Sequence, residues 1–120
     1  DNNIMKLDAG TEEMYQKINR CRNEMKLSDI VDNLLLFNGN LIIQTLFIKG
    51  DFQGQYIDNT ILSEIDPWLG YLQKIIPKSV MIYPIARATP LKGLEKVKID
   101  ELNKIADKVK ALGLKAEVYE

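Results

Sequence analysis

The chain has 120 residues, of which 46% are hydrophobic and 28% are charged, and its formal net charge is -1. These values are typical of a globular domain and exclude disordered, collagen-like and membrane-spanning compositions. A chain of this length buries roughly two-thirds of its surface in one core, so we expect a single domain over residues 1–120. The acidic balance and the lack of a basic run disfavour nucleic-acid binding by this chain.

The cysteine and histidine content limits the available chemistry. Cys21 is the only cysteine and histidine is absent, which excludes an internal disulfide and a cysteine-ligated metal site made by this chain alone. The first residues lack the basic and apolar pattern of a signal peptide. The apolar run Leu41–Ile48 is far shorter than the ~20 residues of a membrane span. We therefore expect a cytoplasmic protein without membrane association.

Apolar runs rich in β-branched residues alternate with segments of helical period, which favours βαβ units and a parallel sheet. We expect an α/β fold with about four mainly parallel strands and about three helices. The expected elements, in chain order, are a strand over Asn3–Leu7, a short helix capped by Thr11, a helix capped by Ser28 and stopped at Asn38-Gly39-Asn40, a strand over Leu41–Ile48, a helix over Ile61–Ile76, a strand over Ser79–Ile85, a helix from Ile99 or Asp100 that ends at a left-handed Gly113, and a strand over Leu114–Tyr119.

Glycine and proline indicate where these elements are broken. Lys49-Gly50-Asp51 is expected to end the second strand, and Phe52–Asn59 then reads as a loop. Pro67 should kink or interrupt the helix that contains it. Ala86–Val97 forms a second long loop. Because both loops are long for strand-to-helix connections, we interpret them as segments that face a ligand.

Lys6 and Asp8 form the first candidate site. In parallel α/β sheets, ligands bind beyond the carboxyl ends of the strands, and these two residues lie at the end of the first expected strand on one side of it. If helices cover the opposite side, both charges point inward, which is costly unless they are paired or bind a ligand. The alternative is a structural ion pair between the two residues, or an exposed edge strand.

Gln44 and Thr45 form the second candidate site, because they are adjacent polar residues within an otherwise apolar strand. Their side chains point to opposite faces of the sheet, so one of them should face the interior of the fold. A buried amide or hydroxyl needs a hydrogen-bond partner. A cofactor group would serve, and so would a backbone group or a water molecule.

Tyr83 and Arg87 form the third candidate site, at the end of the third expected strand. The guanidinium of Arg87 could hold a carboxylate or phosphate through two parallel hydrogen bonds. The alternative is that Arg87 is only the partner in a surface ion pair. We assign Trp68 to packing and give Cys21 no role.

The chain resembles the second half of the catalytic domain of radical S-adenosylmethionine (radical SAM) proteins of the Fe-S oxidoreductase type, related to wyosine tRNA-modification enzymes. The resemblance spans nearly the whole chain. It is carried by MKLDAGTEEMYQKINR, LIIQTLFIKGD and the segment from Ser79 to Tyr119, and most specifically by Lys6-Leu7-Asp8-Ala9, Ile18-Asn19-Arg20, Gln44-Thr45 with Lys49-Gly50, and Tyr83 through Pro90.

The resemblance implies a fold, a cofactor and site residues. The fold would be the C-terminal half of a (β/α)6 radical SAM barrel, a partial TIM-like barrel. S-adenosylmethionine would contact Lys6, Asp8, Gln44 and Thr45, and the substrate would contact Tyr83 and Arg87. In the family, a [4Fe-4S] cluster held by three cysteines reduces S-adenosylmethionine and generates a 5'-deoxyadenosyl radical, which the protein orients and shields.

The three-cysteine loop of the family is absent from this chain, so the chain by itself should be inactive. We expect a piece of a longer radical SAM enzyme, whose partner is the missing N-terminal half of the barrel. The first strand would then have an exposed edge through which the isolated piece could dimerise. The alternative is a non-catalytic α/β binding or interaction module, which should be closed and covered by helices on both faces. The sequence does not identify the substrate.

Overall fold

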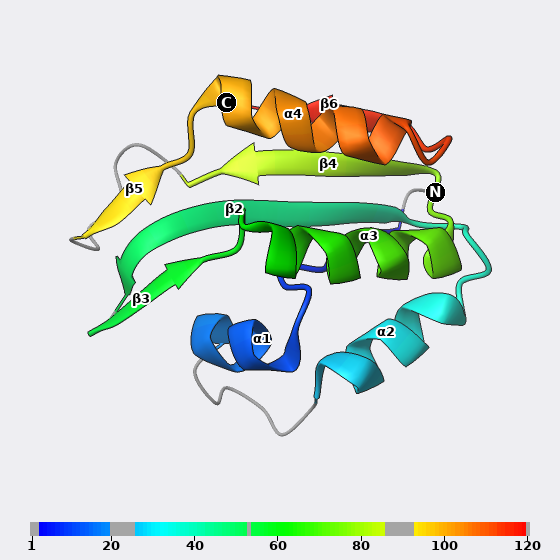
Figure 1. The fold of residues 1–120 in the computed structure, drawn as a ribbon. Coiled ribbons are helices and arrows are strands. Elements are labelled where there is room, and N and C mark those ends of the chain that lie inside the picture. Colours follow the sequence, from blue (N-terminus) through cyan, green and yellow to red (C-terminus); the bar gives the residue numbers. More distant parts are fainter. Residues whose placement is uncertain (1–2, 20–25, 53, 86–92, 120) are drawn as a thin grey trace.

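The computed structural model describes residues 3–19, 26–52, 54–85 and 93–119, which form six strands and four helices (Figure 1). The elements, in chain order, are β1 (Ile4–Lys6), α1 (Glu12–Asn19), α2 (Leu27–Leu35), β2 (Ile42–Phe52), β3 (Gln55–Asp58), α3 (Leu62–Ile75), β4 (Ser79–Pro84), β5 (Leu94–Lys96), α4 (Ile99–Lys110) and β6 (Ala116–Val118).

Four strands form the parallel sheet that the alternating pattern predicts. Their order is β1-β2-β4-β6, and every neighbouring pair on this path is parallel. Helices connect the successive strands, as parallel pairing requires. The architecture is therefore mixed α/β and corresponds to a partial TIM-like barrel, which confirms the predicted fold class.

The helices lie on one side of this sheet, where α3 and α4 run across it in Figure 1. We call this side the covered face. Alternate residues of the strands point toward it and are buried, namely Ile43, Thr45 and Phe47 on β2 and Val80 and Ile82 on β4. The side chains between them point to the opposite side, the open face, and are only partly buried. Among the described residues, no helix packs on the open face.

The second strand is longer than the sequence indicates. It was expected to end at Lys49-Gly50-Asp51, but β2 continues to Phe52, and its last part pairs antiparallel with β3 on one side and β5 on the other. The expected loop over residues 52–59 therefore contains β3, and the described end of the second expected loop contains β5. These three strand segments extend beyond the parallel sheet at the carboxyl ends of its strands (Figure 1).

Gly50 explains why the prediction for β2 was wrong. Its φ is +124°, and a Cβ atom at this position would lie 2.1 Å from the carbonyl oxygen of Gly93. The N–H of the next residue, Asp51, donates a hydrogen bond to the same carbonyl at 2.9 Å. Glycine therefore permits the close approach of β5 instead of ending the strand.

The helix boundaries confirm some expectations and correct others. The Thr11 hydroxyl accepts a hydrogen bond from the Met14 N–H at 3.2 Å and so caps α1 as predicted. Ser28 is not a cap, because α2 already begins at Leu27 after Lys26. Pro67 does not interrupt α3, since the carbonyl that loses its donor belongs to an exposed turn, where water can replace the missing N–H. Gly113 has the predicted left-handed conformation, with φ +87°.

Candidate functional site

Two rows of residues cross the open face near the carboxyl ends of the parallel strands. In the first, which we call the polar row, Lys6 pairs with Gln44, Gln44 with Met81, and Met81 with Glu117. Paired residues of parallel strands point to the same side of the sheet. The row therefore carries a cation on β1, a carboxamide on β2 and a carboxylate on β6, all accessible from the same side.

The second row lies one step closer to the strand ends, and we call it the aromatic row. Leu46 pairs with Tyr83, and the Tyr83 ring stacks on the Tyr119 ring with centroids 4.6 Å apart and an angle of 8° between the planes. At the other end of the row, the Leu46 N–H donates to Asp8 Oδ1 at 2.9 Å. Leu46 on β2 therefore lies between the two predicted residues, with Asp8 after β1 on one side and Tyr83 on β4 on the other.

Asp8 is a half-buried carboxylate at the end of β1. Its side chain is 18% exposed, and its Oδ2 lies 4.0 Å from the ammonium of Lys6, whose side chain is 64% exposed. Burial raises the pKa of the Asp8 carboxyl above its usual value, while the hydrogen bond from the Leu46 N–H and the charge of Lys6 lower it less. The predicted ion pair exists, but it is long and open to solvent. Pairing with Lys6 therefore does not offset the desolvation of Asp8.

Gln44 and Thr45 point to opposite faces, as expected. The Thr45 side chain is 1% exposed on the covered face. Its hydroxyl donates to the Leu7 carbonyl at 2.7 Å and accepts a hydrogen bond from the Trp68 indole N–H at 3.2 Å. The Thr45 hydroxyl is therefore bonded to groups of the protein itself, which is the alternative to a cofactor contact. Gln44 is the member of the pair that belongs to the open face.

The third candidate site is only partly described. Tyr83 lies on the open face, where the Tyr119 ring covers one side of its ring. Arg87, which was expected to contact the substrate together with Tyr83, lies outside the described residues. Lys6, Asp8, Gln44 and Tyr83 are therefore the predicted site residues that the fold brings to the open face.

Two buried polar residues were missed by the sequence analysis. Asn59 is 2% exposed and Glu64 is 6% exposed. Glu64 Oε1 accepts hydrogen bonds from the N–H groups of Gly10 and Thr11, and its Oε2 accepts one of 2.6 Å from the Thr11 hydroxyl. This side chain thereby ties the first turn of α3 to the turn between β1 and α1. Acidic residues are common in the first turn of a helix, where they interact favourably with the helix dipole, so no sequence pattern indicated that Glu64 is buried.

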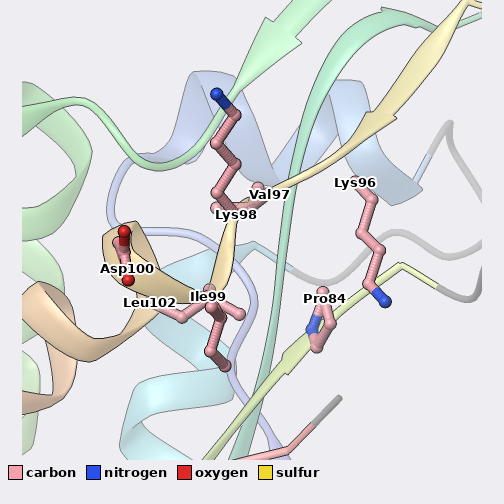
Figure 2. A pocket seen from close by; sticks show the side chains of 7 residues that line it. All are labelled: Pro84, Lys96, Val97, Lys98, Ile99, Asp100 and Leu102. Carbon is pink, nitrogen blue, oxygen red and sulfur yellow. The ribbon is translucent and has the colours of Figure 1, made fainter.

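A pocket of about 420 Å³ lies at the carboxyl end of β4, beside β5 and the start of α4 (Figure 2). Its lining is mainly apolar, and in Figure 2 the Lys96 side chain extends toward Pro84 whereas the Lys98 side chain points away from it. Pro84, one of its lining residues, has the strand parity of the covered face. The five predicted site residues within the described ranges do not line this pocket, which is thus separate from the two rows. The lining residues are Pro84, Lys96, Val97, Lys98, Ile99, Asp100 and Leu102.

The described ranges contain no group of three or more His, Cys, Asp or Glu side chains that could hold a metal ion. Cys21 lies outside these ranges, and a chain with one cysteine cannot supply the three thiolates of a radical SAM cluster. The donors on the open face are oxygen and nitrogen groups. They suit a polar organic ligand rather than an iron-sulfur cluster. None of the described helices is both long enough and apolar enough to cross a bilayer.

Comparison with known proteins identifies a similar fold. No family model matches the chain, and no curated protein matches it significantly. Among solved structures, a radical SAM methyltransferase from Sphaerobacter thermophilus superposes on 98% of this chain with a TM-score of 0.70 and 14% sequence identity. The chain spans 33% of the length of that protein. At this identity, the similarity concerns the fold alone.

Proposed function

We propose that this chain is the C-terminal half-barrel of a radical SAM iron-sulfur enzyme and supplies part of its cofactor and substrate pocket. The observation that carries the proposal is the open face, where polar and aromatic side chains line the carboxyl ends of four parallel strands. This is the position at which barrel enzymes bind their ligands. The similarity in fold to a radical SAM methyltransferase supports the same assignment.

The residues of the open face have the chemistry to hold S-adenosylmethionine, a ligand with hydroxyl, amino and carboxylate groups. Asp8 Oδ2 can accept a hydrogen bond from a hydroxyl, and Lys6 can pair with a carboxylate. Gln44 can both donate and accept hydrogen bonds. Thr45 would act indirectly, because its hydroxyl is already bonded to Leu7 and Trp68. Tyr83 and Arg87 would contact the substrate.

The iron-sulfur cluster would have to be held by another part of the enzyme. When bound beside a reduced cluster, S-adenosylmethionine supplies an organic radical, and the residues of this chain would orient the ligand and exclude water from it. The chain alone would therefore be inactive. The finer relation to wyosine tRNA-modification enzymes is part of this proposal and rests on the sequence resemblance alone, as does a cytoplasmic location.

The edge of β1 provides a site for the rest of the barrel. Among the described residues, β1 pairs with β2 on one side only, and Ile4 is 47% exposed. We propose that the N-terminal half of the barrel pairs with this edge. In the isolated chain a second copy could take its place. Helices on one side of the sheet support the half-barrel over a self-contained binding module, which should cover both faces.

The first test is to sequence the coding region upstream of residue 1 in the source genome. A preceding segment in the same frame that encodes a three-cysteine loop is the expected result. A start codon immediately upstream would contradict the catalytic proposal and favour the binding module.

If the segment exists, the longer protein should form 5'-deoxyadenosine from S-adenosylmethionine under reducing, anaerobic conditions. Gln44→Leu should weaken S-adenosylmethionine binding about tenfold, because one well-placed hydrogen bond contributes about 1.4 kcal/mol. Gln73→Leu is the matched control, since Gln73 is exposed on α3. Equal affinities of the two variants would remove Gln44 from the binding site.

A further inference from the structure

Asn59 lies between the end of β1 and the middle of β2, although it belongs to neither strand. It follows β3 and precedes α3, and its side chain is 2% exposed. Its Oδ1 accepts a hydrogen bond from the Ile48 N–H at 2.9 Å, and its Nδ2 donates to the carbonyls of Leu46 at 2.8 Å and Asp8 at 2.9 Å. The carboxamide therefore joins two strands where their own pairing stops.

Asn59 also contacts both residues of the hydrogen bond that orients the Asp8 carboxylate, Leu46 and Asp8. Regular pairing of β1 with β2 ends near Leu7, whose N–H donates to the Gln44 carbonyl at 3.1 Å. Beyond this point, the Leu46 N–H bonds to Asp8 Oδ1 instead of to a backbone carbonyl. The Asn59 side chain donates to the backbone carbonyls of Leu46 and Asp8, so one side chain holds the backbone of both residues that form that bond.

This arrangement leaves one carboxylate oxygen for a ligand. Asp8 Oδ1 is used inside the fold, whereas Oδ2 is directed toward Lys6 on the open face at 4.0 Å. A strand end that served packing alone would not need a desolvated carboxylate, because burying a charge without close pairing is costly. The cost is understandable if the orientation of Asp8 matters to a ligand.

We infer that Asn59 is a positioning residue, which fixes the Asp8 carboxylate so that Oδ2 faces the ligand site. The inference rests on the proposed role of Asp8 in ligand binding. It adds a residue from the β3–α3 connection. Asn59 is the last residue of the segment that was interpreted as facing a ligand, but it was not itself a candidate site residue. Its role is to orient Asp8, and it is buried away from the ligand itself.

The test follows the Leu46 amide proton of the 120-residue chain by NMR as a function of pH. An amide that donates to a carboxylate changes its shift when that carboxylate ionises, so in the unsubstituted chain this proton should titrate together with the Asp8 Cγ signal. In Asn59→Ala, the amplitude of the Leu46 titration should fall at least twofold. Ile105→Ala, which removes a buried side chain of α4 far from Asp8, is the control for general destabilisation and should keep the full amplitude.

An unchanged Leu46 amplitude in Asn59→Ala would overturn the inference. If Asn59→Ala does not fold, Asn59→Ser retains one hydroxyl donor, which cannot reach both carbonyls, and the same reduced amplitude is expected. S-adenosylmethionine binding, measured on the longer protein that carries the rest of the barrel, separates the two proposals. A reduced titration without any binding of S-adenosylmethionine would retain the positioning role and refute the proposed cofactor, whereas binding with an unchanged titration would do the reverse.

Discussion

The two faces of the parallel sheet use adjacent residues of the same strands in different ways. On the covered face, Ile43 and Thr45 are buried under helices, and the Thr45 hydroxyl bonds only within the fold. On the open face, Ile42 and Gln44 are partly exposed, and Gln44 belongs to a row that ends in opposite charges. The difference indicates that one face maintains the fold, while the other is available for binding.

The largest expected effect comes from two identical residues that point to opposite faces. Ile43→Ala should destabilise the chain by about 3 kcal/mol, because it leaves a cavity in the buried core. Ile42→Ala, the matched control on the open face, should cost about 1 kcal/mol or less. Chemical denaturation of both variants measures the contrast. Equal losses would mean that the open face is covered in the isolated chain, for example by a second copy.

A smaller loss of stability is expected for substitutions of Gln44 and Thr45, the polar residues that follow Ile43. Thr45→Val keeps the shape of the side chain but leaves the Leu7 carbonyl and the Trp68 N–H without their hydrogen-bond partner. Thermal unfolding should therefore show a loss of about 2 kcal/mol. Gln44→Leu should change the free energy of unfolding by about 0.5 kcal/mol or less. A comparable loss for Gln44→Leu would show that Gln44 supports the fold rather than a ligand.

The smallest effect concerns Asp8 and has the opposite sign. Because the pKa of its carboxyl is raised in the folded chain, the folded state binds more protons than the unfolded state between the usual Asp pKa of about 3.9 and the raised value. Stability should fall as pH rises through this window. Asp8→Asn can still accept the hydrogen bond from Leu46, so it should stabilise the chain at pH 7 by about 1 kcal/mol or less.

This stabilisation should disappear below about pH 4, where Asp8 is protonated in both states. Urea denaturation at pH 7 and at pH 3.5 measures the two values. A destabilised Asp8→Asn variant at neutral pH would show that the charge of Asp8 supports the fold, in which case the two faces would not differ as described.

The sequence predicted the parallel sheet because its signals are local and repeated. Each parallel strand except the last is an apolar run that precedes a segment of helical period, and short-range patterns of this kind indicate both element type and the parallel connection. Strand parity also separated Gln44 from Thr45 correctly. The fold class and the opposite orientations of Gln44 and Thr45 could therefore be anticipated from the sequence. That Gln44 shares a face with Lys6, Asp8 and Tyr83 depends on the register of β1, β2 and β4.

The antiparallel strands and the buried polar groups could not be anticipated. A glycine in an apolar run often marks the end of a strand. Gly50 instead lies within β2, because it allows the close approach of Gly93, which lies 43 positions away in the sequence. Asn and Glu usually lie on the protein surface, and the positions of Asn59 in a loop and Glu64 in a first helical turn are usually exposed as well. Their burial depends on the backbone groups of residues 8, 10 and 11, contacts of long sequence separation that no periodicity encodes.

The central place of β2 has a consequence for the order of folding. Of the five strand pairings in the described residues, four involve β2 and only the β4–β6 pairing does not. The β2–β3 hairpin is local in sequence, whereas the pairings with β1 and β4 join residues nearly 40 positions apart. Local pairings close at a lower entropic cost. The hairpin should therefore form early and present β2 as the template on which β1 and β4 assemble, so that the open face is completed last.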